Sequence, residues 1–388
     1  MKTKIQLALL LLTGTMGALA LFPSSARPDP SNSAWQVFPS PNVGSQDNVL
    51  IAVAGSSRSD VWAVGQYVPD NGTNHTNTLA LHYNGSAWSV VPSPSAPDTA
   101  TAFLSVTAAY SRAWAVGYGL PTFFAQSLIA AWDGSHWTLV PHPQPGMSDM
   151  LFAVEAVSDR DVWAAGWRRT DDTVFHTLVE HFDGTKWTVV PTPDPGALGN
   201  QLYGLHAIAS NDIWAVGQKL TGTGPDSSLV LHWNGSSWTE VNVAPMAKAG
   251  TELLSVAGHW AGGLLAVGES QDYVQSSRTF AVRAGSFHWG IVPSGNVGTG
   301  ENHLVSVAVN EAGNAWAVGH SADAEDKNGL TLIERFDGSS WTVVPSPNGT
   351  TDGNNFLGGI AVVGGELWAV GTFDGPDAAQ TLILHSSR

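Results

Sequence analysis

The feature that most constrains this chain is a five-residue segment that recurs seven times. In most copies it reads as an apolar residue followed by Trp-Ala-Val-Gly, and the copies are spaced 52, 49, 51, 51, 51 and 52 residues apart. They begin at Val61, Ala113, Val162, Ile213, Leu264, Ala315 and Leu367. Self-similarity at such a regular period indicates a repeat architecture, in which each copy marks one structural unit.

Each unit divides into four short strands. An apolar strand precedes the Trp strand, and a third strand such as 177–182 follows after a loop of variable length. An Asp-Gly or Asn-Gly pair then reverses the chain into a fourth strand such as 186–190, which a proline-rich stretch ends. Both dipeptides favour two-residue hairpins, because the turn needs positive φ, and proline cannot continue a ladder. Four antiparallel strands per repeat predict one blade of a β-propeller.

The outer strands decide how the array closes. A Trp marks the outer strand in six units, whereas the seventh unit stops at 381–385, where its hairpin should turn. The segment 34–41 near the N-terminus matches 186–193 almost residue for residue. We therefore predict an all-β, seven-bladed β-propeller of four-stranded antiparallel blades, in which the N-terminal strand completes the C-terminal blade. This closure removes two exposed sheet edges.

One position in the first strand of every unit is occupied by a small residue. Its occupants are Ala52, Ser105, Ala153, Gly204, Ser255, Ser306 and Gly359. Seven strands that converge on one axis leave no room for larger side chains, since protein interiors are close-packed. The pattern predicts close contact between neighbouring first strands.

The N-terminus has the pattern of a secretory signal peptide. Lys2 and Lys4 precede an apolar run over 5–22, with small residues at 18–20 and 24–26. We assign 1–26 to a signal peptide and 32–388 to one propeller domain. An uncleaved anchor is the alternative reading, so the expected location is extracellular, either secreted or anchored at the cell surface.

Composition limits the partners. The chain has no cysteine, which excludes disulfides, thiolate metal sites and a lipoprotein anchor. Its net charge is −16. The charge also argues against nucleic acid, whose phosphates require clustered Lys and Arg. We expect a monomer with no membrane insertion beyond an N-terminal anchor.

The repeated Trp strands and the [Asp/Asn]-Gly-x-x-Trp hairpins resemble those of secreted bacterial seven-bladed propellers of the kelch, Asp-box and tectonin-like kinds. The resemblance covers 32–388. The double glycine of kelch repeats is missing, and so is the Asp-box spacing, because Asp and Gly are adjacent here. Propellers of this build serve as lectins, adhesion modules, lyases and glycosidases, so the resemblance does not choose a function.

The long, variable loops all emerge on one face of the predicted disc, which we expect to be the binding face. A polar residue opens each blade there, suited either to a hydroxyl-rich ligand or to an Asx or ST turn. These residues are Asn48, Thr101, Asp149, Asn200, Thr251, Asn302 and Asn355. The candidate ligand-binding residues are Asn48, Asp149, Asn200, Asn302, Asn355, Trp167, Arg168 and Arg169.

Most of the 17 Trp occupy repeat positions and are expected to pack between blades. Trp167, at the start of a long loop, and Trp260 are off the pattern and are candidates for exposed aromatic platforms. Acidic loop clusters include Asp70 with 71, 74 and 75, residues 171–172, and 323–326 with His320. Such oxygens suit Ca²⁺, but none has the spacing of a dedicated calcium loop. We therefore predict no cofactor.

Two polar patterns lie inside strands. His82, His181, His232 and His385 share one position of the third strand, and we predict interblade hydrogen bonds there rather than metal ligation. The Asp residues two positions before Trp, such as Asp60, are read as turn residues. Glu155 and His206 occupy the same strand position in adjacent blades. They are an acid–base pair, a buried ion pair or two unrelated polar residues.

The leading hypothesis is an extracellular, non-catalytic recognition module that binds a glycan or a protein on the face with the long loops, so no catalytic residue is assigned. A propeller lyase or glycosidase with an active site in an axial pocket is one alternative. A structural surface scaffold is another. A retaining glycosidase would need two carboxyl groups about 5 Å apart.

Overall fold

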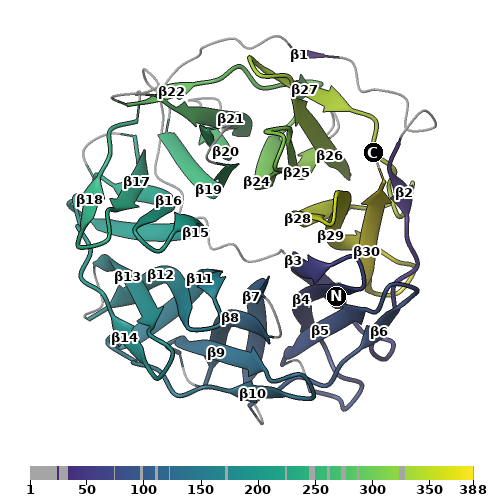
Figure 1. Cartoon of the computed structure of the whole chain (residues 1–388). Coiled ribbons are helices and arrows are strands. Elements are labelled where there is room, and N and C mark those ends of the chain that lie inside the picture. The colour runs from purple at the N-terminus through teal and green to yellow at the C-terminus, as the bar shows by residue number, and fades with distance from the viewer. Residues whose placement is uncertain are drawn as a thin grey trace.

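The computed structural model describes residues 24–25, 34–73, 75–96, 99–109, 112–121, 123–170, 174–222, 225–243, 250–259, 263–271, 277–285, 288–322 and 328–387. Seven sets of four antiparallel strands surround a central axis (Figure 1). Blades three and four are joined into one sheet by a single parallel bridge between Phe175 and Gly199. The predicted all-β, seven-bladed propeller is confirmed. Among these residues, no helix is long and apolar enough to cross a membrane.

The strands follow in chain order, and each blade runs from the axis outward. Blades one to three are β3 (Asn48–Ser57), β4 (Asp60–Tyr67), β5 (Asn77–Tyr83) and β6 (Trp88–Val90); β7 (Ala100–Ala109), β8 (Arg112–Leu120), β9 (Gln126–Trp132) and β10 (Trp137–Leu139); and β11 (Ser148–Ser158), β12 (Asp161–Arg169), β13 (Phe175–Phe182) and β14 (Trp187–Val189). Blades four and five are β15 (Gly199–Ala209), β16 (Asp212–Leu220), β17 (Ser227–Trp233) and β18 (Trp238–Glu240); and β19 (Gly250–His259), β20 (Gly263–Gln271), β21 (Ser277–Ala284) and β22 (Trp289–Ile291). Blade six is β24 (Asn302–Val309), β25 (Ala315–Ala322), β26 (Gly329–Phe336) and β27 (Trp341–Val344).

Blade seven contains both ends of the ring. Its strands are β28 (Asn355–Val363), β29 (Glu366–Asp374), β30 (Ala379–Ser386) and, from the N-terminus, β2 (Gln36–Val37). Gln36 lies opposite His385, and the Phe38 amide donates to the Ile383 carbonyl at 2.8 Å. Trp35 is only 5% exposed and packs in the core of this blade. The predicted closure by the N-terminal strand is confirmed.

A short strand pair lies outside the blades. β1 (Ser24–Ser25) pairs in parallel with β23 (Asn296–Val297). These two residues belong to the segment assigned above to a signal peptide, and that assignment stays a prediction.

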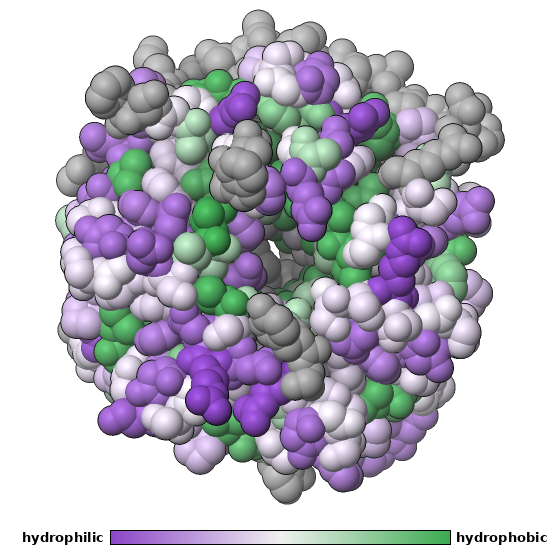
Figure 2. All heavy atoms as spheres, in the orientation of Figure 1, coloured by the Kyte–Doolittle hydropathy of each residue, from purple (hydrophilic) through white to green (hydrophobic). Residues whose placement is uncertain are grey.

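The first strands, which lie nearest the axis, show why one of their positions always holds a small residue. In all seven, the register shifts by one residue at the same place, which marks a β-bulge. The small residues follow this bulge, and a Cβ on Gly204 would lie 2.9 Å from the Cα of Ser255 in the next blade. The Ser105 and Ser255 hydroxyls accept hydrogen bonds from the next blade at 3.3 and 3.2 Å. Close contact around the axis is thus confirmed. Figure 2 shows the opening at the centre of the disc.

The spaces between blades are filled by Trp. Of the repeat-position Trp side chains, all but Trp214 are at most 9% exposed, which confirms their packing role. Each of these rings buries roughly 150–250 Å², so the large core needs no disulfide.

The recurring histidines bond within their own blade, so the interblade prediction is wrong. His181 Nε2 lies 2.8 Å from Asp161 Oδ1, and the Trp163 Nε1–H donates to the same oxygen at 2.8 Å. The His181 ring stacks on Trp163 with centroids 4.1 Å apart. The reason is register: Trp163 and His181 are cross-strand partners in β12 and β13, so Asp161 reaches both. It is therefore more than a turn residue.

Candidate functional site

Strand register identifies the two faces of the disc. In blade three, Ser158 and Asp161 pair at a tight turn, whereas Asp149 and Arg168 pair at the other end of the same two strands. The connections between second and third strands, and between blades, leave from this other end. We call it the loop-bearing face. All the predicted ligand-binding residues lie at this end of their strands.

The four predicted asparagines are buried and hold their own loops. Asn48, Asn200, Asn302 and Asn355 are at most 1% exposed. Asn302 Oδ1 accepts from the Val297 amide at 2.8 Å, and its Nδ2 donates to the Gly300 carbonyl at 2.8 Å. Asn48 makes the matching contacts in its own loop. These side chains brace the connection that enters each blade, and ligand binding by them stays a prediction.

Asp149 differs from the asparagines. It is 1% exposed, and its Oδ1 has no hydrogen-bond partner among the described residues. Burial raises the pKa of Asp149 to about 6, opposed by a backbone hydrogen bond from Gly146. Arg168 lies opposite it in β12. The two residues are cross-strand partners, and ligand binding by them stays a prediction.

The predicted aromatic platform at Trp167 is wrong. Strand β12 continues to Arg169, so Trp167 lies within the strand rather than in a loop and is 9% exposed. Its ring meets Phe175 edge to face at 4.9 Å. The Arg169 guanidinium lies over the same Phe175 ring at 5.3 Å. Trp260 lies outside the described residues.

The loop-bearing face of blades two to four instead exposes aliphatic and aromatic side chains that sequence reasoning missed. Leu120, Phe123, Met147 and Leu198 are 38%, 102%, 41% and 54% exposed. Backbone contacts tie part of this surface together, since the Met147 amide donates to the Arg169 carbonyl at 2.7 Å. We call these four residues, with Arg168 and Arg169, the loop-face patch. The missed signal was the apolar pair at 123–124 in a loop.

A second group lies one residue beyond the asparagine rank, where each first-strand residue pairs with the residue after the repeated glycine. Blades one, two, three and seven place Val49 with Gln66, Ala102 with Tyr118, Met150 with Trp167, and Phe356 with Thr372. Blades four, five and six place Gln201 with Gln218, Glu252 with Glu269, and His303 with His320. We call these three polar pairs, with Tyr203 and Glu301, the interblade polar cluster.

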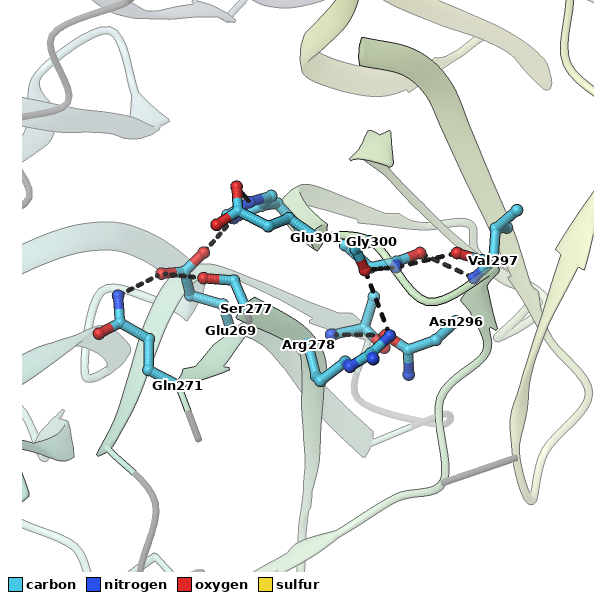
Figure 3. A network of polar contacts seen from close by, with 11 residues as sticks. Glu269, Gln271, Ser277, Arg278, Asn296, Val297, Gly300 and Glu301 are labelled. Carbon is cyan, nitrogen blue, oxygen red and sulfur yellow. Dashed lines mark hydrogen bonds and ion pairs between the residues drawn. The ribbon is translucent and has the colours of Figure 1, made fainter. Parts of the chain in front are cut away.

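Glu269 of blade five (Figure 3) is bonded to His303 of blade six, and this pair connects the two blades. Glu269 Oε2 contacts His303 Nδ1, and its Oε1 accepts from Gln271 at 3.2 Å and from Ser277 at 3.5 Å. His303 Nε2 lies 3.6 Å from Glu301 Oε2. Burial opposes the charge of His303, but the hydrogen bonds to Glu269 and Glu301 raise its pKa to about 9. The imidazole is therefore protonated at neutral pH.

Glu252 lies against this ion pair. It is 6% exposed, and its Oε1 has no hydrogen-bond partner in the described part of the chain. Burial, reinforced by the negative charge of Glu269, raises the pKa of Glu252 to about 8. In blade four, the Tyr203 hydroxyl and the Gln218 amide both donate to Gln201 Oε1.

The predicted Glu155–His206 pair is formed, across blades three and four. His206 Nδ1 lies 3.5 Å from Glu155 Oε1, and His206 Nε2 donates to the Gly258 carbonyl in blade five at 3.0 Å. Burial opposes protonation of His206, but these contacts raise its pKa. Both ring nitrogens are thus engaged, which favours the ion-pair interpretation over an acid–base role.

The acidic loop clusters form no metal centre in the part of the chain that is described. Asp70 accepts hydrogen bonds from the Ser45 amide and hydroxyl. Residues 74, 171–172 and 323–326 lie outside the described ranges. Within those ranges, no group of three His, Asp or Glu side chains is arranged to hold a metal ion.

Neither a protein-family model nor a curated protein sequence matches the chain. Among solved structures, the chain is similar to YCF48 from Cyanidioschyzon merolae, with 14% identity, a TM-score of 0.54, and coverage of 91% of this chain and 98% of that one. It is also similar to YjhT, with 11% identity, a TM-score of 0.48, and coverage of 78% and 99%. The likeness to YCF48 shows the β-propeller fold alone.

Proposed function

We propose that this chain is a non-catalytic recognition module that acts outside the cell and docks a protein partner on the loop-face patch. One observation carries the proposal: Phe123 is fully exposed at the loop-bearing face, with three more exposed apolar side chains in blades two to four. Large apolar side chains that are exposed on one face of a molecule are candidates for an interaction site. Exposed aromatic residues are frequent anchors of such sites.

Charge indicates the kind of partner. The chain carries a net charge of −16, yet Arg168 and Arg169 lie at the end of β12, where the Arg169 backbone bonds that of the exposed Met147. Arginine side chains pair with carboxylates in a fixed fork. We therefore expect a partner segment that is acidic and apolar, because such a segment complements this sector and is repelled by the rest of the acidic surface.

Binding is favoured over hydrolysis by the carboxyl groups. Glu252 and Glu269 are cross-strand partners in β19 and β20, and His303 already engages Glu269 Oε2, whereas a retaining glycosidase keeps one carboxylate free as the nucleophile. A protein ligand is favoured over a glycan because Trp167, the expected stacking platform, is buried. The extracellular location rests on the N-terminal sequence pattern.

The test is a display selection against immobilised protein, using a library of random peptides, followed by calorimetry of the selected peptides. We expect acidic, apolar peptides to be enriched, and Phe123→Ala and the double change R168A/R169A each to weaken binding at least tenfold. Val189→Ala serves as the matched control, because Val189 is 37% exposed on outer strand β14. Peptides that bind all variants equally, or binding to a glycan array alone, would contradict the proposal.

A further inference from the structure

We propose that the interblade polar cluster is a separate binding site for a primary ammonium group, and that Glu252 releases its proton to solvent when this group binds. The site lies in blades four to six, whereas the loop-face patch lies in blades two to four. It sits at the same loop-bearing face, and Glu301, at 49% side-chain exposure, forms its outer edge.

The donors that form hydrogen bonds within the cluster serve acceptors other than Glu252. Glu269 accepts from three neighbours, namely His303, Gln271 and Ser277. The two donors of blade four, Tyr203 and Gln218, are both directed to Gln201. Glu252 Oε1 receives no hydrogen bond from any described residue, although it is buried. A buried acceptor without a partner is costly, so a ligand that fits here must bring N–H or O–H groups.

The charges favour a cation among such ligands. The charges that act on the Glu252 carboxyl group are those of Glu269, Asp226 and His303, and of these only His303 is positive. The nearby Arg278 is not part of the cluster, because its guanidinium donates to the carbonyls of Gly300 and Thr299 at 3.2 and 3.1 Å (Figure 3). In the unliganded protein, a proton neutralises Glu252. A bound ammonium group replaces that proton: the carboxylic acid becomes a carboxylate paired with the ligand, and one proton enters the solvent.

An ammonium group fits better than a metal ion. A metal site requires several ligand atoms directed at one point, and no described group of three His, Asp or Glu side chains has that arrangement. An ammonium group has three directed N–H donors. One of them can satisfy Glu252 Oε1 without displacing the Glu269–His303 pair.

Calorimetry of the full chain at neutral pH tests the proposal, with putrescine as the probe and butanediol as its uncharged counterpart. Alkylamines are protonated at this pH. We expect putrescine to bind at least tenfold more tightly than butanediol. Titrations in two buffers of different ionisation enthalpy should reveal the release of a proton by the unmodified chain.

Variants separate this site from the loop-face patch. Glu252→Gln preserves the shape of the protonated side chain, so we expect it to fold, to release no proton and to bind putrescine at least tenfold more weakly. Gln66→Ala, at the matching rank in blade one, and Phe123→Ala should leave putrescine binding unchanged. Equal binding of the two probes, absence of putrescine binding, or binding without proton release would each overturn the proposal, whatever peptides the loop-face patch binds.

Discussion

Two buried glutamates at equivalent positions of the third strand have different neighbours, yet burial raises the pKa of both. Glu180 and Glu334 are both fully buried. Glu180 lies 3.2 Å from His142. Among the described residues, Glu334 accepts hydrogen bonds only from neutral donors, Ser294 Oγ at 2.9 Å and the Gly295 amide at 3.2 Å. Burial raises the pKa of Glu334 from 4.5 to about 8 against these bonds, so the folded protein holds this carboxyl neutral.

This residue predicts a pH dependence of stability. Below pH 4.5, Glu334 is protonated in both the folded and unfolded chains; between 4.5 and about 8, only the unfolded chain ionises. Because the unfolded chain then binds fewer protons, this residue lowers the free energy of unfolding as the pH rises. Glu334→Gln should remove the decrease. At the upper end of this range, we expect the free energy of unfolding of Glu334→Gln to exceed that of the parent by more than about 1.4 kcal/mol, the equivalent of one pKa unit.

The measurement is denaturant unfolding across that pH range. Glu311→Gln, a change at an exposed turn of the same blade, should follow the parent at every pH. Parallel curves for the parent and Glu334→Gln would show that Glu334 does not titrate as described.

At the scale of one element, the repeated glycine and the bulge form a unit. A Cβ on the glycine of any second strand would lie 1.9–2.2 Å from a carbonyl oxygen of the first strand. In blade four these atoms belong to Gly217 and Gln201, the residue that begins the bulged segment. The bulge brings the inner strand too close for any side chain, which explains why every copy of the repeat ends in glycine.

Gly217→Ala should therefore destabilise the fold by about 3 kcal/mol or more, at the upper end of the cost of overpacking. Gly290→Ala, in β22, is the matched control, because a Cβ there meets nothing within 4 Å. Its effect should stay within about 0.5 kcal/mol. Denaturant unfolding measures both, and equal effects would contradict the packing explanation.

The blades could be predicted, because the repeat period, the Asp-Gly and Asn-Gly hairpin dipeptides and the Trp positions are all visible in the sequence. The bulge could not, because a one-residue shift leaves no mark in the hydrophobic pattern, yet it changes which side chains share a face. The repeated polar residue led to Asn302 and its equivalents. The polar pairs at His303 and its equivalents lie one residue later and occur in three of the seven blades, so no repeat marks them. The loop-face patch was missed because loops have no repeat against which Phe123 would stand out.

At the scale of the whole molecule, the two chain ends hold the ring together. Trp35 fills the interior of the last blade, Gln36 and Val37 pair with β30, and the Ser40 hydroxyl lies 2.8 Å from that of Thr381. Burial of one Trp contributes roughly 4–6 kcal/mol before other terms. Without this strand, β30 becomes an exposed edge and the innermost strands lose their continuous circle of contacts.

The most direct test of the account is therefore hydrogen exchange and thermal melting of two truncated chains, one that begins at residue 34 and one that begins at residue 42. We expect the longer chain to melt like the parent and to protect the amides of 382–386. The shorter chain should melt well below it, with fast exchange in β30 and self-association through the exposed edge. If the shorter chain is as stable, as protected and as monomeric as the longer one, the ring is not closed by its N-terminal strand.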